Sequence, residues 1–165
     1  MMKLRYLAFY CLASVGLLAC AQTKYPVKKI FATYHEVLPG NIAVDASGDE
    51  VDSRDTVNYV YVETQSNNIK WTNAWKDNKS YSVIATLVEG DALDVGTNKA
   101  TGRDIIVTAT PGNKLWSLRL LPSEVNLPSP KKIACCQILL RGSYKSKEIF
   151  ETVSDIVEVA RAPSQ

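Results

Sequence analysis

Short runs of alternating apolar and polar residues recur along most of this 165-residue chain. They are rich in Val, Ile, Thr, Tyr and Trp, which suit the pleated, half-buried surface of a β-sheet. Turn-forming residues separate them, at positions 39–41, 66–68, 77–79 and 111–113. The pattern predicts strands over residues 27–37, 57–64, 69–75, 81–88, 104–110, 114–121, 133–141 and 147–160.

Two of these runs indicate which side chains face the core. In residues 114–121, Trp116, Leu118 and Leu120 share one face, and polar side chains share the other. In residues 69–76, Ile69, Trp71 and Trp75 would share the apolar face, opposite two lysines and a threonine. Because successive side chains of a strand point to opposite faces of the sheet, each run predicts one buried face.

About eight strands at this spacing predict an all-β fold. We expect a single antiparallel β-sandwich, immunoglobulin-like in general architecture, with about seven to nine strands. The proline-rich stretch at residues 122–132 suits a connection that crosses between sheets. Residues 149–160 have spacing that is compatible with a helix, but their density of Val and Ile favours a strand. One domain, residues 22–165, accounts for the pattern.

The N-terminal residues have the three zones of a secretory signal peptide. Lys3 and Arg5 form a positive region, and a run of 14 uncharged, mostly apolar residues follows, from Tyr6 to Ala19. A membrane-spanning helix needs about 20 such residues. The sequence therefore predicts an exported protein with no transmembrane helix, in which residues 1–21 are a cleavable signal.

Two cleavage sites are compatible with this signal. Ala19 and Ala21 are small residues suited to cleavage after residue 21 by ordinary signal peptidase. The sequence around Cys20 also resembles a bacterial lipobox, although Leu18 departs from that pattern. In that case residues 1–19 are removed and Cys20 carries a lipid anchor. The expected location is the bacterial envelope, as a periplasmic protein or an outer-membrane lipoprotein, or the medium.

The charge of the chain argues against nucleic acid as a partner. The formal net charge is +2, from 19 basic and 17 acidic residues. Removal of the signal takes away Lys3 and Arg5 and leaves equal numbers of each sign. A neutral domain lacks the basic surface that phosphate binding requires.

His35 is the only histidine of the chain. A catalytic histidine needs a nucleophile and an orienting group, and the Gly-x-Ser-x-Gly motif of many hydrolases is absent from the sequence. We expect a structural or surface histidine on the face of Phe31 and Thr33. An extracytoplasmic hydrolase of unfamiliar type, using His35 and a carboxylate, is an alternative.

Cys135 and Cys136 are adjacent, a spacing that permits a strained vicinal disulfide, a redox switch or a soft-metal site. A strand over residues 133–141 would place them on opposite faces. Cys136 would then be a small buried hydrophobe beside Ile138 and Leu140, and Cys135 would share the other face with Gln137. We expect two ordinary strand residues.

An acidic segment between residues 45 and 55 suggests calcium, whose preferred ligands are oxygen atoms. Its spacing fails the EF-hand template, so we predict a solvated loop and no bound metal or cofactor. A calcium-stabilised structural domain remains an alternative. The acidic residues are Asp45, Asp49, Glu50, Asp52 and Asp55.

Tyr59 and Tyr61 are the best candidates for a binding surface. If Val60 and Val62 face the core, the two tyrosines stand side by side on the outer face of the sheet. Tyrosine brings apolar area and a hydroxyl to glycan or peptide contacts at low entropy cost. The alternatives are a cross-strand pair or a sheet covered on both faces. We therefore predict a non-enzymatic binding module for a protein or glycan partner.

Overall fold

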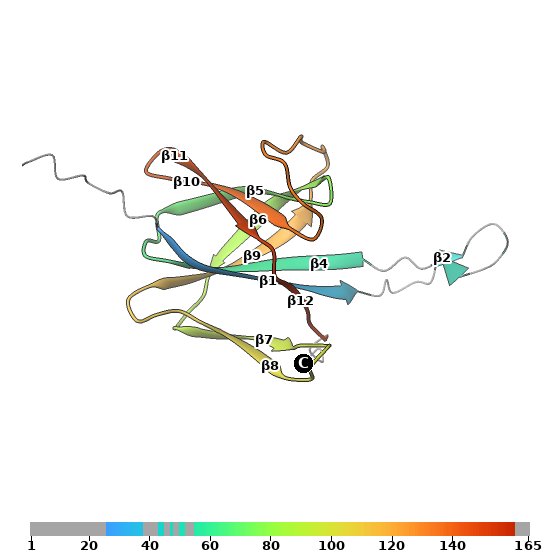
Figure 1. The fold of residues 1–165 in the computed structure, drawn as a ribbon, viewed down its shortest axis with the longest axis horizontal. Coiled ribbons are helices and arrows are strands. Elements are labelled where there is room, and N and C mark those ends of the chain that lie inside the picture. Colours follow the sequence, from blue (N-terminus) through green and yellow to red (C-terminus); the bar gives the residue numbers. More distant parts are fainter. Residues whose placement is uncertain (1–25, 38–42, 45–46, 48–49, 52–54, 161–165) are drawn as a thin grey trace, which may run out of the picture.

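The computed structural model describes residues 26–37, 43–44, 47, 50–51 and 55–160, and this part of the chain contains strands and no helix (Figure 1). The all-β class predicted from the sequence is confirmed. The predicted signal residues 1–21 and Cys20 lie outside the described residues. The strands are β1 (Val27–Val37), β2 (Ala43–Val44), β3 (Glu50–Val51), β4 (Asp55–Thr64), β5 (Ile69–Lys76), β6 (Lys79–Leu87), β7 (Ala92–Thr97), β8 (Asp104–Thr108), β9 (Lys114–Pro122), β10 (Ile138–Tyr144), β11 (Lys147–Val153) and β12 (Ile156–Glu158).

Eight strands form one sheet, in the order β11-β10-β5-β6-β9-β4-β1-β12. Adjacent strands in this sheet run antiparallel, except that β1 and β12 run parallel to each other, so the sheet is mixed. Only Ser154 and Asp155 separate β11 from β12, yet these two strands lie at opposite edges. A link this short joins the two edges only because the sheet curls strongly. The sandwich-like arrangement thus comes from one curled sheet whose halves face each other.

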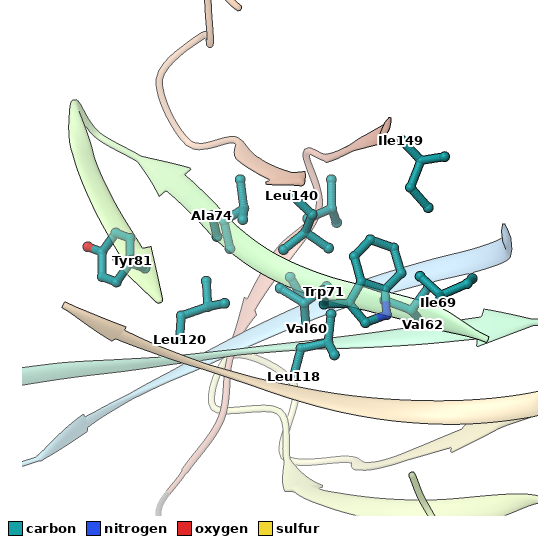
Figure 2. Packing of buried hydrophobic residues seen from close by; sticks show 13 residues of the cluster. Val60, Val62, Ile69, Trp71, Ala74, Tyr81, Leu118, Leu120, Leu140 and Ile149 are labelled. Carbon is teal, nitrogen blue, oxygen red and sulfur yellow. The ribbon is translucent and has the colours of Figure 1, made fainter. Parts of the chain in front are cut away.

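The concave side of the curled sheet encloses the main hydrophobic core. Val60 and Val62 of β4 and Leu118 of β9 are fully buried there, together with Leu140 of β10. Figure 2 shows these side chains converging on Trp71 of β5 from several strands. The expected inward faces of residues 57–64 and 114–121 are confirmed.

A β-bulge changes the alternation within β5. Trp71 pairs with Gly142 of β10 and Asn73 pairs with Arg141, so Thr72 is the extra residue, without a residue directly opposite it in β10. Ile69 and Trp71 face the core as expected, but after the extra residue the core position falls to Ala74 instead of Trp75. The prediction that Trp75 shares the face of Trp71 is therefore wrong, although Trp75 is buried.

The β9–β10 connection covers Trp75 from the other side. The Trp75 indole Nε1 donates to the carbonyl of Leu127 at 3.0 Å. Ser80, in the same region, donates its backbone N–H to Asn126 Oδ1 at 2.8 Å, and its Oγ accepts from Leu127 N at 2.9 Å. These bonds hold the connection across the turn of the β5–β6 hairpin as it passes from β9 to β10.

A second layer lies over the outer face of the sheet, where β7 and β8 form an antiparallel hairpin (Figure 1). Leu93, Val95 and Val107 of this hairpin pack against a smaller apolar cluster that includes Tyr61 of β4 and Leu115 of β9. The sequence pattern predicted the strand at β8 but missed β7. The β7–β8 hairpin therefore covers part of the outer face of the sheet.

Candidate functional site

Four aromatic side chains from two neighbouring strands form a row on the outer face of the sheet. We call it the aromatic row: His35, Tyr59, Tyr61 and Phe31, in that order. The ring centroids are 5.8 Å apart for His35 and Tyr59, 6.4 Å for the two tyrosines, and 6.5 Å for Tyr61 and Phe31. Each neighbouring pair is stacked with interplanar angles between 8° and 27°.

Strand register explains the row. Phe31 of β1 lies directly opposite Tyr61 of β4, and Thr33 lies opposite Tyr59. Residues at every second position share a face, so His35 continues the line of Phe31 and Thr33 along β1. The sequence prediction that the tyrosines lie side by side on the outer face, with His35 on the face of Phe31, is confirmed.

The β7–β8 hairpin covers the row unevenly. Tyr61 is 6% exposed, whereas Tyr59 and His35 are half-buried. A cavity of about 410 Å³ opens beside the less covered end and is lined by His35, Tyr59, Leu93 and Asp94, among others. We call this the hairpin cavity. Its volume falls within the range of about 300–1,000 Å³ that is usual for small-molecule sites.

A second cavity, of about 500 Å³, lies at the other end of the row. Phe31, Glu63 and Lys29 line it, together with residues of β8. Tyr61 lines both cavities, so the two cavities are adjacent to the same buried tyrosine.

Thr33 is a buried polar residue that lines the hairpin cavity. Its side chain is 1% exposed and lines the cavity, and Oγ1 forms no hydrogen bond of normal geometry with a described residue. Burial raises the pKa of Tyr61, and the nearby Thr33 hydroxyl acts against this rise. The Thr33 and Tyr61 hydroxyls therefore lie close together at the buried side of the hairpin cavity.

Hydrogen bonds hold both ends of the hairpin in place. On the approach from β6 to the hairpin, Val88 N donates to the carbonyl of Leu115 in β9 at 2.9 Å. At the other end, Lys99 N donates to the carbonyl of Glu158 at 3.0 Å, just beyond β7. The roof of the hairpin cavity is therefore tied to two different strands of the sheet.

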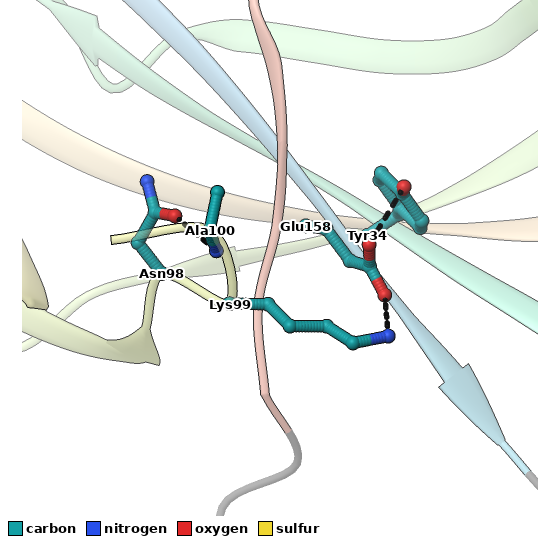
Figure 3. A network of polar contacts seen from close by, with 5 residues as sticks. All are labelled: Tyr34, Asn98, Lys99, Ala100 and Glu158. Atoms are coloured by element: carbon teal, nitrogen blue, oxygen red, sulfur yellow. Dashed lines mark hydrogen bonds and ion pairs between the residues drawn. The ribbon is translucent and has the colours of Figure 1, made fainter. Parts of the chain in front are cut away.

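Side chains strengthen the contact at the far end (Figure 3). Glu158 accepts from the Tyr34 hydroxyl at 3.2 Å and forms an ion pair with Lys99. Lys99 lowers the pKa of Glu158, and the hydrogen bond with Glu158 raises the pKa of Lys99. Asn98 shapes the adjoining turn, because its Oδ1 accepts from Ala100 N at 2.9 Å.

Glu63 is a buried carboxylate that the sequence analysis did not single out. It is 2% exposed, and its Oε1 accepts from Thr110 N at 3.0 Å and from Asn113 Nδ2. Its Oε2 lies 3.2 Å from Lys29 Nζ. Burial alone would raise the pKa of Glu63, but the bonds from Asn113, Thr110 and Lys29 outweigh it and hold the pKa at about 2. Glu63 thus fixes the turn between β8 and β9.

The structure corrects the prediction for the cysteine pair. Cys135 and Cys136 are both free thiols and both exposed, in a turn that precedes β10. The strand begins only at Ile138, so the alternation assumed for residues 133–137 does not apply. Cys136 has φ of 63°, which is incompatible with a regular strand. The interpretation of Cys136 as a small buried hydrophobe is wrong.

The acidic segment falls largely outside the described residues. Of its five acidic residues, Glu50 lies in β3 and Asp55 is exposed at the start of β4, and the other three lie outside the described residues. Within the described part of the chain, no group of three or more His, Cys, Asp or Glu side chains gathers into a metal site. In the same residues, no helix is long and apolar enough to cross a membrane.

Comparison with known proteins found no matching family model, no matching curated protein and no matching solved structure. The site must therefore be interpreted from its own chemistry. Stacked aromatic side chains, the buried Thr33 and the acidic residue Asp94 line one cavity, and these residue types are suited to binding.

Proposed function

We propose that this protein is a non-enzymatic binding module that takes a glycan in the hairpin cavity. The observation that carries the proposal is the placement of Tyr59 and His35 beside Thr33 and Asp94 in one cavity of ligand size. A sugar ring presents apolar C–H groups and several hydroxyls. Aromatic side chains can pack against the C–H groups of the sugar, and hydroxyl and carboxylate side chains can form hydrogen bonds with its hydroxyls.

The shape of the site favours a glycan over a protein partner. A stable protein interface buries roughly 800 Å² on each side. Tyr61 is nearly inaccessible under the hairpin, so the two tyrosines do not form an open platform of that kind. A cavity of about 410 Å³ suits one or two sugar rings better than a protein surface.

Isothermal titration calorimetry with a panel of defined oligosaccharides tests the proposal. Tyr59→Leu removes the ring but keeps apolar bulk, and we expect it to weaken binding about tenfold, equivalent to about 1.4 kcal/mol. Val125→Ser, at an exposed position of the β9–β10 connection, is the matched control and should bind like the parent protein. Equal affinity of the Tyr59→Leu variant and the parent, or no binding across the panel, would contradict the proposal.

One observation favours the hydrolase alternative. His35 and Asp94 are both lining residues of the hairpin cavity, so a histidine and an acidic residue lie close to each other at a candidate site. Asp94 already accepts a hydrogen bond from Gly96 N at 2.9 Å through Oδ1. Chromogenic glycosides and esters provide the assay, and turnover that is lost in His35→Ala would support catalysis over simple binding.

Export is a separate part of the proposal, supported by the charge and apolar pattern of residues 1–21. The intact mass of the protein from its native host tests it. A chain that begins at Cys20 with added lipid indicates an anchored lipoprotein, and a chain that begins at Gln22 indicates a soluble exported protein. An unprocessed N-terminus would contradict export.

A further inference from the structure

The β9–β10 connection carries a chemical feature unrelated to the aromatic row. Two adjacent thiols, Cys135 and Cys136, are exposed on it, and neither forms a disulfide. In a strand, such neighbours would point to opposite faces of the sheet. Here they occupy a turn, and Cys136 is in the left-handed region, with φ of 63°. The alternation that separates neighbouring side chains in a strand therefore does not apply to these two cysteines.

The turn is fixed on both sides of the pair. Gln137 accepts a hydrogen bond from Ala134 N at 3.2 Å and donates through Nε2 to Ser154 Oγ at 3.1 Å. Upstream, Lys131 Nζ lies 4.6 Å from the centre of the Phe150 ring. The two thiols thus sit on a short, anchored stretch, where a left-handed non-glycine residue is a form of stored strain.

We infer that Cys135 and Cys136 are a redox-active vicinal dithiol that closes to a disulfide by exchange with a small-molecule disulfide. Exposure gives the exchange partner access to the sulfur atoms. Adjacent Cα atoms are about 3.8 Å apart across a trans peptide. Ordinary disulfides join Cα atoms about 4.4–6.8 Å apart, so this one is strained and easily reduced. Strained, exposed disulfides belong to the labile and regulatory kind.

The reaction consists of two exchanges. The thiolate of one cysteine attacks an external disulfide, forms a mixed disulfide and displaces one external thiolate. The thiolate of the other cysteine then attacks its neighbour's sulfur and displaces the second external thiolate. In total, the pair loses two protons and two electrons, and the external disulfide is reduced to two thiols.

The sequence provides a direct test on the full chain. Trypsin cleaves after Lys132 and Arg141, and the fragment 133–141 contains Cys135 and Cys136 but no other cysteine. The reduced protein is equilibrated with reduced and oxidised glutathione at a series of ratios, quenched with acid, alkylated and digested. Mass spectrometry then gives the state of this fragment at each ratio.

We expect a fragment lighter by two hydrogens and free of alkylation, at a fraction that rises with oxidised glutathione. Cys135→Ser and Cys136→Ser are matched variants at exposed positions, and each should lose this species completely and accumulate a glutathione adduct instead. The inference is overturned if the parent protein shows only adducts or intermolecular disulfides, or keeps two alkylated thiols at every ratio. None of these results depends on glycan binding.

Discussion

Replacement of Glu63 by glutamine tests whether the buried carboxylate stabilises the turn between β8 and β9. The carboxylate accepts from Thr110 N and Asn113 Nδ2 and pairs with Lys29, which is 65% exposed. Glutamine keeps the size of the side chain but removes the charge and one acceptor oxygen. We expect Glu63→Gln to be less stable than the parent at neutral pH.

The magnitude follows from the pKa. Glu63 has a pKa of about 2 in the folded protein against an ordinary value of 4.5. One pKa unit corresponds to about 1.36 kcal/mol, so the ionised group contributes about 3 kcal/mol to the free energy of unfolding at pH 7. Because the pKa is lowered on folding, this contribution is complete above the unfolded-state pKa. It is lost as the pH falls from about 4.5 towards 2, and about 2 kcal/mol of it is gone at pH 3.

Urea denaturation of the parent and of Glu63→Gln between pH 7 and pH 3 provides the measurement. The stability difference between the two proteins should shrink by about 2 kcal/mol over this range. Glu124→Gln, which removes an exposed carboxylate from the β9–β10 connection, sets the baseline for loss of one surface charge. A difference that stays constant with pH would refute the reasoning, because it would show that the carboxylate has the same pKa in both states.

Three further changes probe the packing and turns of the sheet. Gly142→Ala would place a Cβ 2.9 Å from the Trp71 ring, so thermal melting should show a loss of about 1–3 kcal/mol. Lys145 and Ser146 both have positive φ in the two-residue β10–β11 turn; the double change to Asn-Gly should raise stability by about 1 kcal/mol, measured by urea denaturation. Leu118→Ala, in the centre of the core, should cost about 2–5 kcal/mol by the same assay, and a smaller loss would mean that the core collapses around the gap.

Local alternation predicted the strands where it was strong and unbroken. Side chains alternate between the two faces of a strand, which places Val60 and Val62 toward the core. The same alternation places Tyr59 and Tyr61 on the outer face. The same rule failed in β5, because one unpaired residue at Thr72 shifts every later side chain to the other face. Such a bulge depends on the partner strand and leaves no clear mark in the local sequence.

The sequence pattern does not predict the turn at Cys135 and Cys136 or the buried carboxylate of Glu63, for different reasons. Residues 133–137 contain no glycine or proline that signals a turn, so the sequence pattern predicts a strand that begins five residues before β10 does. Glu63 lies near the end of β4 among residues typical of strands, and its partners Thr110 and Asn113 are 47 and 50 residues away. The cavity under the β7–β8 hairpin likewise depends on long-range packing. The sequence predicts that Tyr59 and Tyr61 share the outer face of the sheet, but it does not predict that the β7–β8 hairpin covers them.

The pairing of β1 with β12 has a consequence for the order in which the protein folds. Tyr34 and Glu158, which these strands bring together, are 124 residues apart in the chain. During synthesis, β1 therefore emerges long before its parallel neighbour exists, and its outer edge stays open until residues 156–158 are available. Contacts between such distant residues slow folding, and an unpaired edge invites association with other chains. We expect closure of the sheet to be a late step, and the nascent chain to be vulnerable to aggregation until that step.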